Sequence, residues 1–235
     1  MKIKNIFWDV DGVLADLNHA YFNFIKNHSK FKDHFKDFEY KDLPEALPIN
    51  EEKYGAMELK THPLLGVDLD KEFCASNDYY FDRPLYPNTK EVLKNLNKEG
   101  FLQITMSAGF DLTKKRELLN RIFKDLDFIK LRMVEHDKAL GMQGTSKTEE
   151  ILKCMNEFNI KPEECVLVDD RIYNIESVIN TGINVIRFMS EFTTPSPEKL
   201  KNIIHVKNIT ELEDVLLNYQ SQIIDGTVKT REVYI

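Results

Sequence analysis

The sequence predicts an α/β fold with a doubly wound parallel sheet, and three observations support this prediction. Short apolar runs of the kind found in buried strands recur along the chain, and amphipathic helical stretches lie between them. Three of the four clearest runs end in Asp or Ser. Because functional groups of parallel sheets gather at the carboxyl ends of the strands, the pattern also indicates where a site should lie.

The expected core elements follow in chain order. Buried strands are predicted at 6–8, 101–106, 165–168 and 184–188, with a short strand at 203–206. Amphipathic helices are predicted over 89–99, 148–158 and 171–181, and a further helix over 211–217. Gly100 and Gly182 follow two of these helices as C-terminal caps, which supports their boundaries.

Residues 17–83 do not follow this alternation, being rich in aromatic and charged side chains. We interpret them as an inserted, mainly helical cap over the strand ends. Most of its aromatic residues are expected to form a small core, and the remainder to contact a substrate. The α/β core is then expected to span 1–16 and 84–220. We expect residues 221–235 to form a C-terminal tail. Because no periodicity is clear from Gln220 onward, we interpret this tail as an edge strand or as a contact with a neighbouring chain.

Composition limits the class of protein. The 235 residues are 42% hydrophobic and 30% charged, as in a soluble globular protein. With 32 basic and 39 acidic residues the net charge is −7, which argues against binding duplex nucleic acid but not against a small anionic ligand. The three cysteines form no CxxC pair, and the first apolar run is too short for a signal peptide or membrane span. We therefore expect a cytoplasmic protein without membrane contact, and leave its oligomeric state open.

Two acidic pairs carry the strongest chemical signal. Asp9 and Asp11 follow the first strand and precede a turn at Gly12, and Asp169 and Asp170 end the third strand. In one parallel sheet the two pairs converge, and their mutual repulsion calls for a divalent cation with oxygen ligands, for which Mg²⁺ is favoured. Taken alone, the first pair also fits a solvated turn with a helix cap.

Four segments resemble, in order, the motifs of the haloacid dehalogenase (HAD) phosphatase superfamily: residues 9–13 (DVDGV), Ser107 after an apolar strand, Lys147, and 169–170. The resemblance implies that Asp9 attacks phosphorus and forms an aspartyl-phosphate. It implies that Asp11 protonates the leaving oxygen and later deprotonates water. Ser107, the amide near Ala108, and Lys147 then bind the phosphoryl group.

The same resemblance implies the magnesium ligands: the carboxylates of Asp9 and Asp170 and the backbone carbonyl of Asp11. Asp169 is expected to ligate through water or to orient a neighbour. Three alternatives stay open. Thr105 points the same way as Ser107, Lys138 competes with Lys147, and Asn174 is either a polar site residue or an ordinary helix residue.

Asp11 favours phosphate esters over carbon–halogen bonds, because an alkoxide leaving group needs a proton. Phosphomutases share this motif. Residues 9–16, 80–87 and 169–171 also resemble the 5'(3')-deoxyribonucleotidase branch, which implies a nucleotide substrate, although the segment 136–162 is longer than in that branch. A sugar phosphate or another small phosphomonoester is the alternative. The alternative from another functional class is a non-catalytic HAD-like binding module. Such a module would be expected to lack some of the acidic pairs or Lys147, and all of them are present here.

Overall fold

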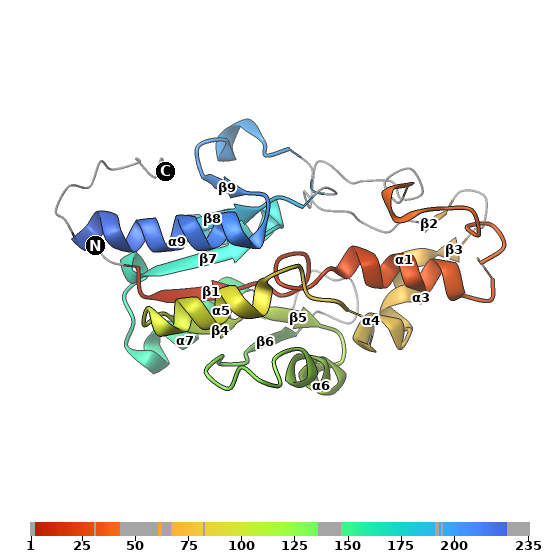
Figure 1. The fold of residues 1–235 in the computed structure, drawn as a ribbon, viewed down its shortest axis with the longest axis horizontal. Coiled ribbons are helices and arrows are strands. Elements are labelled where there is room, and N and C mark those ends of the chain that lie inside the picture. The colour runs from red at the N-terminus through yellow and green to blue at the C-terminus, as the bar shows by residue number, and fades with distance from the viewer. Residues whose placement is uncertain are drawn as a thin grey trace.

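The computed structural model describes residues 3–30, 32–42, 61–62, 67–81, 83–135, 147–190, 193 and 195–224. Its centre is a five-stranded sheet in the order β4-β1-β7-β8-β9, in which all neighbouring strands are parallel (Figure 1). The prediction of a parallel α/β fold is confirmed. None of the described helices is both long enough and apolar enough to cross a membrane.

The strand bounds explain how distant segments meet. The strands are β1 (Asn5–Trp8), β4 (Leu102–Thr105), β7 (Cys165–Asp169), β8 (Asn184–Phe188) and β9 (Ile204–Val206). Trp8 at the end of β1 pairs with Thr105 on one side and Val168 on the other. This register places the residues that follow β1, β4 and β7 at one edge of the sheet.

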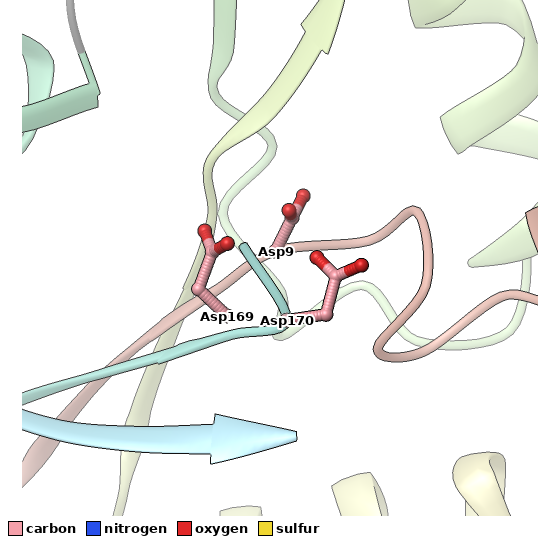
Figure 2. Close-up of side chains that lie close together, drawn as sticks. All are labelled: Asp9, Asp169 and Asp170. Carbon is pink, nitrogen blue, oxygen red and sulfur yellow. The ribbon is translucent and has the colours of Figure 1, made fainter. Parts of the chain in front are cut away.

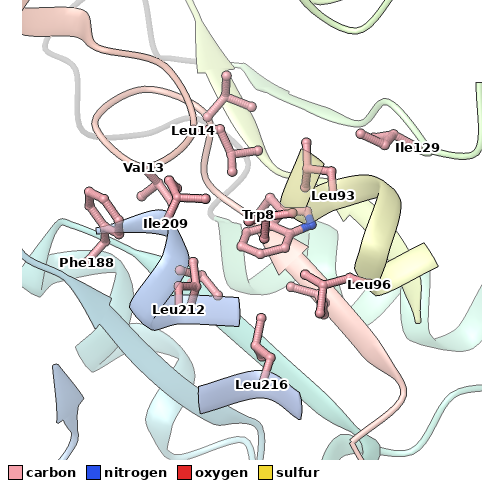
Figure 3. Packing of buried hydrophobic residues seen from close by; sticks show 14 of the residues in the cluster. Trp8, Val13, Leu14, Leu93, Leu96, Ile129, Phe188, Ile209, Leu212 and Leu216 are labelled. Carbon is pink, nitrogen blue, oxygen red and sulfur yellow. The ribbon is translucent and has the colours of Figure 1, made fainter. Parts of the chain in front are cut away.

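Helices cover both faces of the sheet. The helices α5 (Thr89–Lys98), α6 (Leu112–Ile122) and α9 (Ile209–Ile224) contribute to one hydrophobic cluster, and α7 (Lys147–Phe158) and α8 (Ile172–Ile179) contribute to the other. Trp8 packs in the first cluster, beside Leu93, Leu96 and Leu212 (Figure 3). Its neighbour Phe7 packs in the second, because successive side chains of a strand point to opposite faces. Two short 3₁₀ turns, Pro162–Glu164 and Glu198–Leu200, complete this part of the chain.

Three features of the core differ from the sequence prediction. Helix α6 was not predicted, nor was the two-stranded parallel sheet of β5 (Ser107–Gly109) and β6 (Met133–Glu135). Helix α9 (Ile209–Ile224) begins before the predicted start at residue 211 and continues beyond the predicted end at residue 217. The prediction that no helix continues from Gln220 is therefore wrong for residues 220–224. The predicted site candidate Lys138, the aromatic residues Phe31 and Tyr54, and the tail from 225 lie outside the described residues.

The insert after β1 contains α1 (Leu17–Asn27), a 3₁₀ turn (Tyr40–Asp42), β2 (Thr61–His62), β3 (Val67–Asp68), α3 (Leu69–Ala75) and α4 (Asp78–Phe81). These elements lie beyond the carboxyl ends of the core strands (Figure 1). Aromatic side chains form a separate hydrophobic cluster there, in which Tyr21, Phe24 and Phe35 take part as expected. The cluster also takes in Phe73, Tyr79 and Tyr80, so the helices on either side of residues 43–60 share one core.

Candidate active site

Three carboxylates meet at the carboxyl edge of the sheet. Asp9 follows β1, Asp169 is the last residue of β7, and Asp170 follows it (Figure 2). One oxygen from each residue lies within 4.8 Å of the other two, and all three residues are buried. The structure therefore brings the two predicted acidic segments together, as the parallel register requires.

A tight turn after β1 fixes the first of these segments. The Val10 carbonyl accepts hydrogen bonds from the amides of Leu14 at 3.0 Å and Ala15 at 2.8 Å. Gly12 adopts φ +84° in this turn, a conformation that favours glycine. A Cβ atom at this position would lie 2.5 Å from Oδ2 of Asp170, so glycine also permits the close approach of the turn to that carboxylate.

The two members of the second acidic pair differ in their partners. Asp169 accepts hydrogen bonds from Nζ of Lys147 at 2.5 Å, from Nδ2 of Asn174 at 3.0 and 3.1 Å, and from the Arg171 amide at 2.9 Å. In contrast, Oδ1 of Asp170 is buried and has no partner among the described residues. Asp170 is therefore the more available metal ligand, whereas Asp169 is positioned to orient Lys147 and Asn174.

Lys147 links the two acidic segments. It begins helix α7, and its Nζ lies 2.7 Å from Oδ2 of Asp9 and 2.5 Å from Oδ2 of Asp169. Burial lowers the pKa of this lysine, but Asp169 and Asp9 outweigh the effect and raise it to about 12. Lys147 therefore stays charged at neutral pH, where it offsets part of the carboxylate repulsion.

Burial and crowding act in the opposite direction on the carboxyl groups. Burial raises the pKa of Asp9 to about 8, with Lys147 opposing the shift and Asp169 adding to it. Burial and the neighbouring Asp169 likewise raise the pKa of Asp170 to about 6. Both shifts show that the site favours added positive charge, supplied by protons or by a cation.

Asp11 has a different environment from the other three carboxylates. Its Oδ1 accepts a hydrogen bond from Nη1 of Arg83, and its Oδ2 accepts one from Nζ of Lys115 at 2.5 Å. Burial would raise the pKa of Asp11, but these two cations outweigh it and hold the pKa well below its usual range. Burial in turn lowers the pKa of Lys115 to about 8, against the attraction of Asp11.

Arg83 and Lys115 were missed as site residues from the sequence. Lys115 lies in the row of buried positions of helix α6 that continues through Leu118, Leu119 and Ile122. A lysine in such an apolar row signals a buried cation that needs a partner. Arg83 follows helix α4 and carries no comparable periodic signal.

Ser107 and Thr105 are distinguished by their hydrogen bonds. The Thr105 hydroxyl donates to the Arg132 carbonyl and accepts from the Arg132 amide, both at 3.0 Å. The Ser107 hydroxyl is buried and has no hydrogen-bond partner in the described part of the chain. Ser107 is therefore the hydroxyl left available to a ligand, and Ala108 follows it in β5, opposite Val134 of β6.

Known proteins resemble this chain over most of its length. A family model described as haloacid dehalogenase-like hydrolase matches residues 3–182. The chain is 28% identical over 207 residues to a glyceraldehyde 3-phosphate phosphatase from Pyrococcus furiosus, with 80% of this chain and 81% of the relative covered.

Two solved structures share the fold. A structure described as a predicted phosphatase from Clostridium acetobutylicum has a TM-score of 0.59 and 19% identity, covering 93% of this chain and 100% of that one. A HAD-superfamily hydrolase from Ehrlichia chaffeensis has a TM-score of 0.57 and 17% identity, covering 93% and 98%. With the family model matching most of its length, the chain belongs to the haloacid dehalogenase-like hydrolases.

Proposed function

We propose that this hydrolase is a magnesium-dependent phosphomonoesterase that works through an aspartyl-phosphate on Asp9. The observation that carries the proposal is the convergence of the Asp9, Asp169 and Asp170 carboxylates, two of which, Asp9 and Asp169, pair with Lys147. The Ser107 hydroxyl, which has no hydrogen-bond partner among the described residues, adds a donor near the end of β4. Phosphoryl transfer needs alignment and charge neutralisation, and these groups supply both.

The residues present fit a magnesium ion. The carboxylate cluster offers oxygen ligands, and the buried Oδ1 of Asp170 lacks any other partner in the described residues. Asp9, Asp170 and the backbone carbonyl of Asp11 would hold the ion, with Asp169 acting from the outer shell through Lys147 and Asn174. When bound, Mg²⁺ supplies charge neutralisation for the phosphoryl oxygens.

The charges of the site support a phosphate dianion together with one divalent cation. The carboxylates of Asp9, Asp11, Asp169 and Asp170 lie among the cations Arg83, Lys115, Lys147 and Arg171. A fifth cation, Arg187, is buried and donates a hydrogen bond to the Asp170 carbonyl at 3.1 Å. Because Mg²⁺ would offset the repulsion among the carboxylates, these cations remain to attract a phosphate dianion.

The chemistry proceeds in two displacements. An Asp9 carboxylate oxygen attacks phosphorus while the ester P–O bond breaks, and the departing oxygen receives a proton from Asp11. A water oxygen then attacks the same phosphorus while Asp11 takes up its proton, and the Asp9–phosphate bond breaks to release inorganic phosphate. Asp11 rests as a carboxylate between two cations, and the like charge of a bound phosphate favours its uptake of the proton needed for the first step.

For the substrate we propose a small sugar phosphate. The curated relative is a glyceraldehyde 3-phosphate phosphatase, which supports this class over the nucleotides expected from the deoxyribonucleotidase resemblance. We further propose that residues 17–83 act as a cap. The aromatic side chains of their described part pack mainly against one another, which leaves few of them to stack on a nucleobase.

The test is phosphate release from a panel of sugar phosphates and nucleoside monophosphates, with Mg²⁺ or with EDTA, for wild type and Asp9→Asn. We expect release that needs the metal, is lost in the variant, and favours sugar phosphates. Activity that persists in Asp9→Asn would overturn the nucleophile, and a preference for nucleotides would overturn the substrate class. Transfer of the phosphoryl group to a sugar instead of water would indicate a mutase.

A further inference from the structure

The Asp11 carboxylate is bound on both oxygens by cations from different parts of the chain. Arg83 follows helix α4, which lies in the insert, and Lys115 belongs to core helix α6. Both cationic side chains have 0% exposure, whereas the Asp11 side chain is 12% exposed. The carboxylate is thus bound by two fully buried cations, while the Asp11 side chain itself is not fully buried.

The path of Lys115 to Asp11 depends on its neighbours. A Cβ atom at Gly109 would lie 3.0 Å from Cβ and 3.1 Å from Cγ of Lys115, so glycine leaves room for the lysine stem. The Nζ atom also lies 5.9 Å from the ring centroid of Tyr79. Gly109 of β5 therefore leaves space beside the stem of the lysine whose Nζ binds Asp11.

Arg83 is fixed in a similar way. Its Nη2 donates a hydrogen bond to the Tyr79 carbonyl, and its guanidinium carbon lies 4.8 Å from the Tyr79 ring centroid. Tyr79 belongs to α4, so this helix sets the position of the guanidinium. Each Asp11 oxygen therefore has a donor that is itself held in place.

Two buried ion pairs to one carboxylate are an unfavourable way to stabilise a fold. Burying two cations for one carboxylate carries a large desolvation penalty, and apolar side chains in the same volume often give a stabler protein. The arrangement is more readily explained by a need to keep one carboxylate in one orientation. Asp11 is the proposed proton-transfer residue, for which orientation is decisive.

We propose that Arg83 and Lys115 are positioning residues that orient the Asp11 carboxylate for proton transfer to the leaving group. This inference rests on the proposed phosphatase function. Neither residue needs to touch the substrate, because each acts through an oxygen of Asp11. The competing explanation is that the two ion pairs only fasten α4 to α6.

The first experiment compares an alkyl phosphate, whose leaving group needs a proton, with nitrophenyl phosphate, whose leaving group departs as an anion. For Lys115→Met and Arg83→Met, we expect kcat on the alkyl phosphate to fall roughly 10- to 100-fold more than kcat on nitrophenyl phosphate. KM should change little for either substrate. Arg116→Gln, an exposed neighbour on the same helix, is the matched control and should leave both rates unchanged.

The second experiment combines Lys115→Met with Asp11→Asn. If the lysine acts through Asp11, the double variant should be little slower than Asp11→Asn alone. Equal losses on both substrates, or full additivity in the double variant, would overturn the inference in favour of a fastening role. Arg83→Lys keeps the cation and should recover much of the alkyl phosphatase rate, and it provides the comparison if Lys115→Met does not fold.

These outcomes are distinct from failure of the proposed function. Wild type that hydrolyses neither substrate, or Asp9→Asn that hydrolyses both, contradicts the aspartyl-phosphate proposal itself. The positioning role is judged only on a wild-type activity that requires Asp9.

Discussion

Replacing Gly12 by alanine should separate two effects of one methyl group. The residue has φ +84°, so alanine there is strained, and the new Cβ would lie 2.5 Å from Oδ2 of Asp170. Gly100 has the same φ of +84°, but apart from its chain neighbours none of the described residues lies within 4 Å of its Cβ position. Gly100→Ala is therefore a matched control that carries the backbone strain without the steric contact.

The geometry sets the expected magnitudes. The strain of a left-handed alanine is about 1–2 kcal/mol, so Gly100→Ala should lose about this much free energy of unfolding in EDTA. Gly12→Ala should lose more, because it adds the contact with the Asp170 carboxylate. To reach an ordinary contact of 3.4 Å, the Asp170 carboxylate in Gly12→Ala must retreat by about 0.9 Å (3.4 − 2.5). A displacement of about 1 Å in a catalytic group costs roughly 100-fold in rate.

The assay is phosphate release as a function of magnesium concentration, with urea unfolding measured in parallel. We expect Gly12→Ala to lose roughly 100-fold in kcat and to need roughly 10- to 100-fold more magnesium, whereas Gly100→Ala keeps both parameters. Equal losses in the two variants would show that backbone strain alone is responsible. Wild-type magnesium dependence in Gly12→Ala would refute the placement of Asp170 as a ligand.

Four further predictions concern the same edge of the sheet. Ser107→Ala should keep its stability, because the hydroxyl has no hydrogen bond to lose among the described residues, yet fall roughly 100-fold in kcat/KM. Thr105→Val should show the reverse, losing about 1 kcal/mol of unfolding free energy with little change in rate. Asn174→Ala should weaken magnesium binding roughly 10-fold, because it removes two outer-shell hydrogen bonds. In EDTA the unfolding free energy should decrease from pH 3.8 to about pH 8, because Asp9 and Asp170 keep protons that the unfolded chain releases.

Each of these predictions has its own check. Steady-state kinetics and urea unfolding of Ser107→Ala and Thr105→Val test whether Ser107 serves catalysis and Thr105 serves stability. The assignment is wrong if Ser107→Ala loses stability and keeps its rate. Calorimetric titration with MgCl₂ measures the asparagine effect, and unchanged affinity contradicts it. For the pH profile, Mg²⁺ should stabilise the protein more near about pH 8 than near about pH 5, because protons compete with the metal. A gain that is equal at both pH values contradicts the raised pKa values.

The sequence was sufficient to predict the meeting of the two acidic segments. Strand ends in a parallel sheet share one edge, so Asp9 and Asp169 could be placed together from their position after apolar runs. The choice of Ser107 over Thr105 could not be made in this way. It depends on Arg132, whose backbone binds the Thr105 hydroxyl and which lies in a segment for which no strand was predicted.

The partners of Asp11 were also beyond the sequence analysis, for a physical reason. Arg83 reaches Asp11 because helix α4 packs against α1 and α6, and this packing depends on the tertiary arrangement of the insert. Lys115 was different, because its position in the buried row of α6 is visible as a period of 3.6 residues. Recognising that helix would have predicted a buried lysine, although not its partner.

The parallel pairing of β1 with β7 has a consequence for the newborn chain. Asp9 leaves the ribosome well before its neighbours Asp169 and Asp170, which follow it by 160 (169 − 9) and 161 (170 − 9) residues. Until β7 docks beside β1, neither acidic segment has its partner. The three-carboxylate site therefore forms only when β7 docks. A chain interrupted before that point contains Asp9, the proposed nucleophile, without the neighbouring carboxylates of Asp169 and Asp170.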